Sequence, residues 1–411
     1  MGVFLLVSKP TLTFCVPAHY LPTFMSSNLR FVQINLAAIA ANVKTIKHRT
    51  TADVLAVVKA DAYGHGIIPV ARTAIQAGAS WLGTALLEEA VQLRKAGIEV
   101  PTIAWLTPPG DDFEAALKLN IDLSVSSIVQ LSEILDAGSK TGIKPRIHIE
   151  VDTGMRRGGI LNTYNDWSDF LLYLQSKQEH VHVVGLWTHF ARADEPNTQC
   201  TQEQLNVFEQ YSSELQDAGL APEFIHVCNS AATLTRDVSD HKSIVRFGIG
   251  MYGLSPDRGM LGDATDSFGL RPAMQLKAKV VQVKKVSKGS AVGYGGTQVL
   301  KEDTHLGVVM LGYSDGIPRH ATSAVGVSFN GVKAPLVGRV SMDQISVDLG
   351  AATPTVKAGD YATVFGGVDG GYSIDDWANA CKTINYELVT RIARRVRRVY
   401  SEEEMGGAGV L

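Results

Sequence analysis

The stretch Val54-Leu55-Ala56-Val57-Val58 is an uninterrupted apolar run of strand length, and Lys59 follows it directly. The next segment, from Ile67 to Ala77, has the spacing of a helix and ends at Gly78, after which Trp81-Leu82-Gly83-Thr84 has the pattern of a second strand. Apolar strands that alternate with helices are typical of a parallel sheet covered by helices. This part of the chain therefore predicts an α/β fold.

The alternation of strand and helix patterns continues to about residue 250. Six more strand candidates follow the first two: Thr102–Leu106, Ile121–Ser124, Arg146–Val151, Val181–Thr188, Phe224–Val227 and Ser243–Phe247. A segment of helix length separates each candidate from the next. Eight such units in roughly 200 residues predict a (β/α)8 barrel of the TIM type, with a doubly wound sheet as the alternative.

The pattern changes after residue 270, where short alternating apolar segments follow one another and Asn330-Gly331 gives a two-residue hairpin signal. We therefore predict a C-terminal all-β domain after the barrel. The expected division is a loose N-terminal extension over residues 1–28, a cofactor-binding barrel over residues 29–260 and a β-strand domain over residues 261–411. Met25 is an alternative start of the natural protein.

Composition excludes several classes of protein. With 45% hydrophobic and 19% charged residues the chain can bury a large core, which excludes disorder. A net charge of −3 gives no reason to expect nucleic acid or an anionic membrane as a partner, and no apolar run is long enough to span a bilayer. The 4 cysteines have no C-x-x-C spacing, so we expect no disulfide framework and a reducing, cytoplasmic location.

Two further patterns are weak. The arginine run over residues 391–398 is typical of a solvated face, with a nucleic-acid patch as the alternative. His180 and His182 alternate on a strand without a third ligand, so we expect no metal site.

Chemistry in a barrel lies at the carboxyl ends of the strands. Lys59 is the informative residue there, because burial of an ammonium group lowers its pKa and makes the amine reactive, as in Schiff-base lysines. The alternative is a lysine that extends to the rim of the barrel. The other strand ends supply Tyr63, Glu150, Arg157, His189, His226, Ser230, Arg246 and Gly248. An amine, arginines, a histidine and glycine N–H groups are the set that a pyridoxal phosphate site needs.

The segment from Ala56 to Gly66 resembles the cofactor-lysine signature of the alanine racemases. The resemblance continues, in order, through Asp152-Thr153-Gly154-Met155, Thr188-His189-Phe190, Asn229-Ser230-Ala231-Ala232, Arg246-Phe247-Gly248-Ile249, Val292-Gly293-Tyr294-Gly295, Gly312-Tyr313-Ser314-Asp315-Gly316, Ser341-Met342-Asp343-Gln344 and Thr383-Ile384-Asn385-Tyr386-Glu387. It covers roughly residues 31–400, and therefore both expected domains.

The resemblance implies two catalytic bases. Lys59 would hold pyridoxal 5'-phosphate as an aldimine and act on the α-proton of D-alanine, and Tyr294 would act on L-alanine from the opposite face. Two bases on opposite faces are the simplest way to invert a carbon centre. A tyrosine is a poor base unless nearby positive charge stabilises its phenolate, so the site should be rich in cations. The resemblance also implies a homodimer with shared sites, in which each β domain covers the partner's barrel.

The resemblance assigns the remaining roles as well. Arg157 would bind the cofactor's phenolic oxygen and the substrate carboxylate, helped by Met342, and Tyr313 would narrow the substrate entrance. The phosphate would be held by Tyr63, Ser230, Gly248, Ile249 and Tyr386. His189 would lie against the cofactor ring, while His226 and Asp343 would support the site from behind.

Arg246 would donate to the pyridine nitrogen of the cofactor. Because arginine does not give up its proton, that nitrogen stays unprotonated and the ring withdraws fewer electrons. This argues against a decarboxylase, for which a carboxylate at that position would be expected.

Glu150 departs from the family pattern, since many members have a lysine there that is often carbamylated. Glutamate is already an anion of similar reach, so we expect Glu150 to align Arg157 without carbon dioxide. A rim carboxylate without this role is the alternative. Gly158-Gly159 also replaces the bulkier residue that usually follows the equivalent of Arg157.

The expected function is therefore alanine racemisation, with alanine as the substrate and D-alanine supplied for cell-wall peptidoglycan. A racemase of broader specificity is the alternative on the same scaffold. A non-enzymatic carrier of pyridoxal phosphate, built on the barrel alone, is disfavoured by the β domain and Tyr294.

Overall fold

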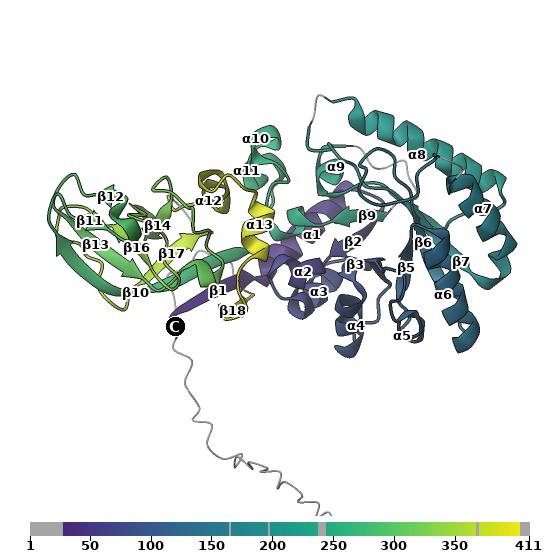
Figure 1. The fold of residues 1–411 in the computed structure, drawn as a ribbon, viewed down its shortest axis with the longest axis horizontal. Helices are drawn as coiled ribbons and strands as arrows, with labels where there is room; N and C mark the ends of the chain where they lie inside the picture. The colour runs from purple at the N-terminus through teal and green to yellow at the C-terminus, as the bar shows by residue number, and fades with distance from the viewer. Residues whose placement is uncertain (1–27, 164–165, 196–197, 237–243, 367–369, 403–411) are drawn as a thin grey trace, which may run out of the picture.

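The computed structural model describes residues 28–163, 166–195, 198–236, 244–366 and 370–402. The expected N-terminal extension, including Met25, lies outside these residues apart from position 28. The described chain forms a barrel with helices around it and a mostly β part beside it (Figure 1).

The barrel is a sheet of eight parallel strands in the order β8-β7-β6-β5-β4-β3-β2-β9. Its strands are β2 (Asp53–Val57), β3 (Trp81–Leu86), β4 (Thr102–Leu106), β5 (Asp122–Val125), β6 (Arg146–Glu150), β7 (His182–Trp187), β8 (Phe224–His226) and β9 (Ile244–Phe247). The two ends of this order approach each other, because the backbone N–H of Arg246 donates to the carbonyl of Cys228 at 3.0 Å. The predicted (β/α)8 barrel is confirmed, and the doubly wound alternative is wrong because the sheet curls until its edges nearly meet.

Helices lie on the outside of the barrel between successive strands (Figure 1). They are α1 (Leu36–Arg49), α3 (Ile67–Gln76), α4 (Leu87–Lys95), α5 (Phe113–Lys118), α6 (Ile128–Thr141), α7 (Asp166–Ser176), α8 (Cys200–Asp217) and α9 (Ser230–Thr235). Local sequence sets several of their ends: Asn35 caps α1 by accepting from the N–H of Ala38, and Ser127 caps α6 by accepting from that of Gln130. Gly142 ends α6 with a φ of 70°.

The second sheet holds β1 (Arg30–Asn35), β10 (Met274–Val286), β13 (Thr304–Val309), β14 (Gly326–Phe329), β15 (Val332–Pro335), β16 (Ile345–Asp348), β17 (Tyr361–Phe365) and β18 (Arg397–Ser401). The predicted hairpin at Asn330-Gly331 is confirmed, with φ values of 49° and 85° in the turn between β14 and β15. The short strands β11 (Ala291–Val292) and β12 (Gln298–Val299) form a separate ribbon.

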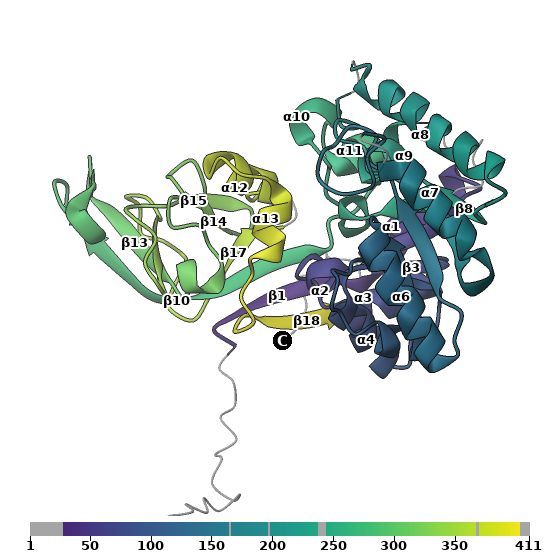
Figure 2. The same cartoon turned by 45° about the vertical axis from the view of Figure 1, so that its right-hand side comes forward.

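Strand β1, near the N-terminal end of the described residues, pairs with strands from the C-terminal part. It pairs antiparallel with β10 and parallel with β18, although the expected division placed residues 29–260 in the barrel. Figure 2 shows β1, β10 and β18 running side by side from the β part toward the barrel. The helices α12 (Ile374–Ala380) and α13 (Asn385–Thr390) lie between the two parts (Figure 2).

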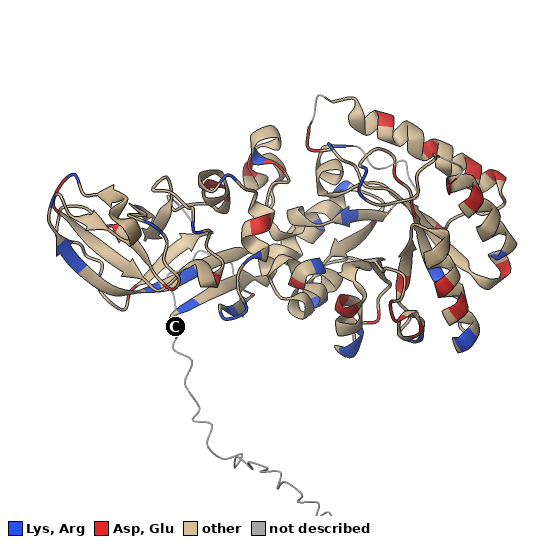
Figure 3. Cartoon of the chain, viewed as in Figure 1, with Lys and Arg blue, Asp and Glu red and all other residues tan. Residues whose placement is uncertain are grey.

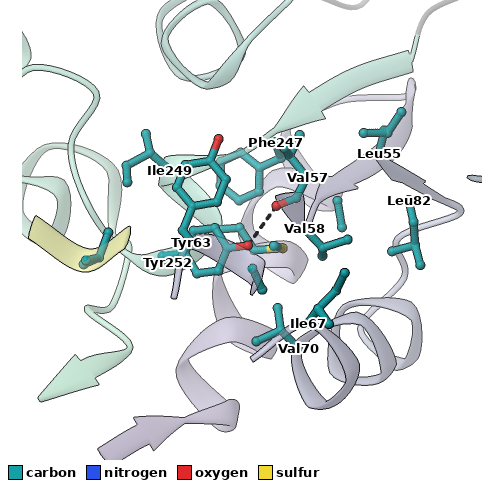
Figure 4. Close-up of a cluster of buried hydrophobic side chains, with 14 of the residues drawn as sticks. Leu55, Val57, Val58, Tyr63, Ile67, Val70, Leu82, Phe247, Ile249 and Tyr252 are labelled. Carbon is teal, nitrogen blue, oxygen red and sulfur yellow. Dashed lines mark hydrogen bonds between the residues drawn. The ribbon is translucent and has the colours of Figure 1, made fainter. Parts of the chain in front are cut away.

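A buried apolar cluster supports the first strand and the turn that follows it (Figure 4). Tyr252, which is fully buried, donates its hydroxyl to the carbonyl of Val57 at 2.8 Å. Its ring packs on Tyr63, with 4.8 Å between the ring centroids. The residues just before and after Lys59 therefore pack against a closely packed, buried cluster.

Charged residues are spread over both parts, with positive and negative segments interspersed (Figure 3). Within the arginine run, Arg395 pairs with Asp315 and Asp343, and Arg398 donates to four backbone carbonyls. Arg395 and Arg398 therefore link separate segments of the described chain to one another. Within the described ranges, every helix is too short or too polar to span a bilayer.

Candidate active site

The lysine that follows the first barrel strand begins an unusual turn. Lys59 starts α2 (Lys59–Tyr63), and the four residues after it, Ala60 to Tyr63, all have φ values of 52–54°. A left-handed conformation costs an ordinary residue roughly 1–2 kcal/mol, so this turn forms only because surrounding contacts impose it. Glu89 supplies one contact by accepting from the N–H of Ala60 at 2.6 Å, and Asp61 supplies another by accepting from the N–H of Ile67 at 2.8 Å.

The surroundings of Lys59 favour its neutral form. Burial lowers the pKa of Lys59, the positive charge of Arg157 lowers it further, and Glu89 partly opposes both effects. The Nζ atom lies 5.8 Å from the centre of the Trp105 ring. An amine that loses its proton more readily than a free lysine is a better nucleophile and a better base.

Backbone and hydroxyl groups near the end of β9 form a small polar cradle. The Oγ of Ser230 accepts from the N–H of Gly248 at 2.8 Å and faces that of Gly250 at 3.4 Å. A Cβ atom at Gly248 would lie 2.9 Å from the hydroxyl oxygen of Tyr63. Tyr63 also faces Tyr386 on α13, with 6.2 Å between the rings. Glycine at position 248 therefore leaves space between the hydroxyl groups of Tyr63 and Ser230, which an atom of one anion would fit.

Arg246 is held in the barrel interior with only 4% of its surface exposed. Its guanidinium donates to the carbonyls of His226, Thr188 and Val227, the latter two at 2.7 and 3.3 Å. It also lies over the Trp187 ring at 5.0 Å. Burial lowers the pKa of Arg246 to about 10, so the group stays cationic at neutral pH.

His189 lies beside this arginine, with its Nδ1 atom 3.4 Å from the guanidinium. Burial, together with the charges of Arg246 and Arg157, lowers the pKa of His189 well below its usual range, so the ring is neutral. Arg157 is exposed and has no hydrogen bond or ion pair to another described residue. Its guanidinium is therefore available to a ligand.

Glu150 ends β6 and is also near these charges. Burial raises the pKa of Glu150 to about 7, although Arg246 and Arg157 favour its anionic form. No hydrogen bond or ion pair joins Glu150 to Arg157 in the described structure, so their alignment stays a prediction. A Cβ atom at Gly158 would lie 3.1 and 3.2 Å from the two carboxylate oxygens of Glu150. Gly158 thus leaves room for the glutamate, which gives a physical reason for the small residue after Arg157.

The other predicted residues lie on loops of the β part and are exposed: Tyr294 is 67% exposed, Met342 53% and Tyr313 38%. Tyr294 begins the short turn η3 (Tyr294–Gly296) between β11 and β12. Tyr313 begins η4 (Tyr313–Asp315), and its backbone N–H donates to Ser341 at 3.0 Å.

The loop over residues 336–344 connects these exposed positions. At one end a Cβ atom at Gly338 would lie 2.8 Å from the carbonyl oxygen of Val292, just before Tyr294. At the other end Ser314 donates to the carbonyl of Met342 at 2.7 Å and to Asp343 at 3.2 Å. Asp343 also pairs with Arg395. Tyr294, Tyr313 and Met342 are therefore carried by one connected set of loops.

This set of loops is far from Lys59 of the same chain. In Figure 1, β11 and β12 lie at the end of the β part that is remote from β2 and α2. The structure thus brings together the barrel residues and Tyr386, but it does not bring Tyr294 to them within one chain. Sequence reasoning did not single out Glu89, Trp105 or Tyr252, because each has the pattern of an ordinary helix or core residue.

The barrel residues fit pyridoxal phosphate. They supply an amine with a lowered pKa, an accessible hydroxyl and N–H cradle for a phosphate, and a buried guanidinium beside a neutral imidazole. They also supply the unpaired guanidinium of Arg157. An aldehyde, a phosphate and an aromatic nitrogen each have a complementary group in this set.

Comparisons with known proteins agree with this fold and identify the family. The profile of the family described as alanine racemase, N-terminal domain, matches residues 34–256, and that of alanine racemase, C-terminal domain, matches residues 273–400. Alanine racemase of Salinispora tropica is 44% identical over 376 residues, 90% of this chain and 98% of that protein. Alanine racemase of Thermobifida fusca is 45% identical over 379 residues, 91% and 99% of the two chains.

Solved structures give the same result. Alanine racemase from D-cycloserine-producing Streptomyces lavendulae has a TM-score of 0.87 and 41% identity, covering 93% of this chain and 98% of that one. Alanine racemase from Bacillus anthracis with bound L-Ala-P has a TM-score of 0.82 and 34% identity, covering 91% and 95%.

Proposed function

Since the chain belongs to the alanine racemase family, we propose that it interconverts L-alanine and D-alanine with pyridoxal 5'-phosphate, using Lys59 and Tyr294 as bases on opposite faces of the substrate. The observation that carries the proposal is the lysine itself: a half-buried amine just after β2, whose pKa is lowered by burial and by the charges of Arg157 and Arg246. When bound, the cofactor supplies an aromatic ring that withdraws negative charge from the substrate Cα atom.

Lys59 holds the cofactor through Nζ and exchanges a proton with the substrate Cα atom once that amine is free. Its lowered pKa increases the share of the neutral amine, which is the form that accepts a proton and then returns it. The turn over residues 60–63 fixes the direction of the lysine side chain, because its conformation is imposed by Glu89 and Asp61.

Tyr294 supplies the second base from another copy of the chain. Its side chain is 67% exposed, and the residue begins the turn between β11 and β12, strands that lie remote from β2 and α2 of the same chain (Figure 1). A homodimer in which each β part covers the barrel of its partner places the phenol opposite Lys59 twice, by two-fold symmetry. The positive charges of Arg157 and Arg246 favour the phenolate form that a tyrosine base requires.

Arg157 binds the substrate carboxylate and the cofactor's phenolic oxygen, since its guanidinium has no other partner among the described residues. Glu150 aligns Arg157 as an anion. Met342 of the second copy adds its backbone to the carboxylate site, and Tyr313 of that copy narrows the entrance. Asp343 supports this loop through Ser314 and Arg395.

Tyr63, Ser230, Gly248, Ile249 and Tyr386 hold the phosphate, and His189 lies against the cofactor ring. Arg246 donates to the pyridine nitrogen. Because its pKa of about 10 keeps this guanidinium charged, Arg246 would donate a hydrogen bond to the pyridine nitrogen without giving up its proton. This arrangement favours return of the α-proton over reactions that require a long-lived carbanion, such as decarboxylation.

The product D-alanine serves peptidoglycan synthesis in the cytoplasm. The first test is racemisation itself: purified protein with pyridoxal phosphate is incubated separately with L-alanine and D-alanine, and both enantiomers are measured with time. We expect both reactions to converge on an equal mixture, without release of carbon dioxide. A panel of other amino acids tests the broad-specificity alternative, which requires comparable kcat/KM values for larger side chains.

A further inference from the structure

A chain of hydrogen-bonded side chains crosses the barrel interior behind Arg246. The guanidinium lies 3.4 Å from Nδ1 of His226, whose Nε2 lies 2.9 Å from Nδ1 of His148. Nε2 of His148 lies 3.2 Å from a carboxylate oxygen of Asp122, and Arg146 binds that carboxylate with two bonds of 2.8 and 3.1 Å. Asp122 and Arg146 begin β5 and β6, so the chain runs from the amino-terminal end of the barrel to the site.

The side chains of this hydrogen-bonded series are buried from solvent over most of its length. His148 is 0% exposed, His226 1% and Asp122 2%. The barrel is also built around it, since a Cβ atom at Gly185 on the neighbouring strand would overlap the His148 ring. In a dry interior an unpaired N–H or lone pair costs roughly 1–3 kcal/mol, so the direction of every bond in the chain matters.

The arginine at one end fixes the direction of the bonds. Arg246 has only donors, so Nδ1 of His226 must present a lone pair to it and Nε2 of His226 must carry the proton. Nδ1 of His148 then accepts, and Nε2 of His148 carries the proton toward Asp122. The reverse arrangement would turn an N–H of His226 toward the N–H groups of Arg246 and leave two donors facing each other.

The charges agree with this direction. Burial lowers the pKa of His226 well below its usual range, and the positive charge of Arg246 lowers it further, so His226 is neutral. Burial by itself would raise the pKa of Asp122, but bonds from His148 and Arg146 outweigh it and lower that pKa. A neutral His226 ring therefore lies between the cation at Arg246 and His148, which contacts the anion at Asp122 on its other side.

We propose that Asp122 and His148 are positioning residues for Arg246, because they hold the His226 ring with its Nδ1 lone pair directed at the guanidinium. Each N–H in the chain polarises the next ring and makes the final lone pair a better acceptor. The guanidinium is thereby kept in one orientation beside the site. This inference rests on the proposed function only in taking that site to be where the cofactor's pyridine nitrogen binds.

The first experiment reads the ring protons directly in the cofactor-free protein. Protonated and unprotonated imidazole nitrogens give well-separated ¹⁵N signals, and selective labelling with ¹⁵N-histidine makes them visible. The His148→Gln and His226→Gln variants assign the two rings. We expect both rings to be neutral with the proton on Nε2. A proton on Nδ1 of either ring, or an imidazolium at His148, would overturn the proposal.

The second experiment compares two substitutions at His148 in the loaded enzyme. His148→Gln keeps one acceptor for His226 and one donor for Asp122, whereas His148→Phe keeps the ring shape and loses both. We expect His148→Phe to lower kcat about tenfold, as loss of an outer partner does at other preorganised sites. We expect KM for alanine to change less than twofold because Arg157 binds the carboxylate, and His148→Gln to recover most of kcat.

A second pair of variants covers the case in which His148→Phe does not fold. Asp122→Leu removes the acceptor at the end of the chain, while Arg146→Gln removes the ion pair on its outer side and leaves the acceptor in place. We expect both to unfold at lower temperature, but only Asp122→Leu to lower kcat and to weaken pyridoxal phosphate binding, by about tenfold each. Equal effects of the two substitutions would overturn the proposal and indicate a purely structural ion pair.

The two proposals fail in different ways. If the wild-type protein racemises alanine and His148→Phe retains its kcat, the positioning role is wrong and the racemase function stands. If the wild-type protein does not racemise alanine, the proposed function is wrong, and the histidine protons and the cofactor affinity then decide the positioning role alone.

Discussion

Gly64 lies directly against the backbone of Val389: a Cβ atom at position 64 would overlap the carbonyl oxygen of Val389. A Cβ atom at Gly66 would likewise overlap the hydroxyl of Tyr400. The turn that carries Lys59 is therefore docked against α13 and β18 without room for a side chain. Because α13 carries Tyr386, this contact places Tyr386, which we propose as a phosphate ligand, beside Tyr63 of the same chain.

Replacement of Gly64 tests this contact. Gly64 has a φ of 78°, and Gly97 has a φ of 76° with nothing within 4 Å of its Cβ position. Gly97→Ala should therefore cost only the left-handed strain, about 1–2 kcal/mol of unfolding free energy. Gly64→Ala should cost a further ~1–3 kcal/mol and weaken pyridoxal phosphate binding. Denaturant unfolding and cofactor titration measure both effects, and equal costs for the two substitutions would contradict the docking.

Lys59→Ala should abolish the visible absorbance of the bound cofactor and lower kcat by at least about a thousandfold, because it removes both the attachment point and one base. The measurement is an absorption spectrum together with borohydride labelling and peptide mapping. Lys279, whose Nζ lies 5.2 Å from the Tyr361 ring on the β part, offers a matched control. Lys279→Ala should leave spectrum and activity unchanged; a label mapped to any lysine other than Lys59 would refute the assignment.

Glu150 should make alanine binding depend on pH. Since its pKa is raised to about 7, its anion and its effect on Arg157 are present above pH 7 and lost as the pH falls. KM for alanine should thus rise on acidification through pH 7, and Glu150→Gln should have a high, flat KM. The stability of the cofactor-free protein should change with pH in the opposite direction. Because the pKa of Glu150 is raised on folding, its carboxyl group stabilises the folded state at low pH, and this contribution is lost as the pH rises through about 7.

The same variant tests whether Glu150 replaces a carbamate. Activity of the wild-type protein should not change when dissolved carbon dioxide is removed, because glutamate carries its own charge. An unchanged KM profile in Glu150→Gln would count against the aligning role.

Gly158→Ala should act through Glu150. Its Cβ would lie 3.1 and 3.2 Å from the carboxylate oxygens, so the glutamate must shift and KM for alanine should rise. In the Glu150→Gln background the same substitution should have less effect on KM, because no charge remains to be displaced. A double-mutant cycle measures the coupling. Fully additive effects would show that Gly158 acts independently of the carboxylate.

The two bases should come from different chains. Lys59→Ala and Tyr294→Phe, each inactive alone, are dissociated together and allowed to reassociate in equal amounts. Random pairing makes about half of the dimers mixed, and each mixed dimer has one intact site, so about a quarter of all sites should recover. If mass measurement confirms mixed dimers and no activity returns, the shared-site proposal is wrong.

The barrel was predictable because its signal is local. The apolar residues before Lys59 and in the later strand candidates are enough to predict that these strands are buried. The hairpin at Asn330-Gly331 is specified by two neighbouring residues. The strand β1 was not recognised as part of the second sheet, because Arg30–Asn35 has no local feature that distinguishes a barrel strand from a partner of β10.

The site was predictable only in part for the same reason. The cofactor residues lie at strand ends, where position and chemistry coincide. Glu89 lies in the first turn of a helix, where acidic residues are common for other reasons, so nothing in its sequence neighbourhood indicates that it holds Ala60. Asp122 and His148 become visible as a chain only when the strands are placed side by side.

The pairing of β1 with β10 also determines the order in which a new chain can fold. Arg30 of β1 cannot pair until Ala278 of β10 has been synthesised, and the whole barrel is synthesised in the interval. At ribosomal rates of 5–20 residues per second this delay is roughly 12–50 s. During that time the barrel can close while β1 stays unpaired. The second edge of β1 stays unpaired for longer, until β18 has been synthesised. A ribosome that stalls after the barrel therefore carries a folded domain with an open strand, which is the kind of intermediate that chaperones bind and that aggregates when they do not.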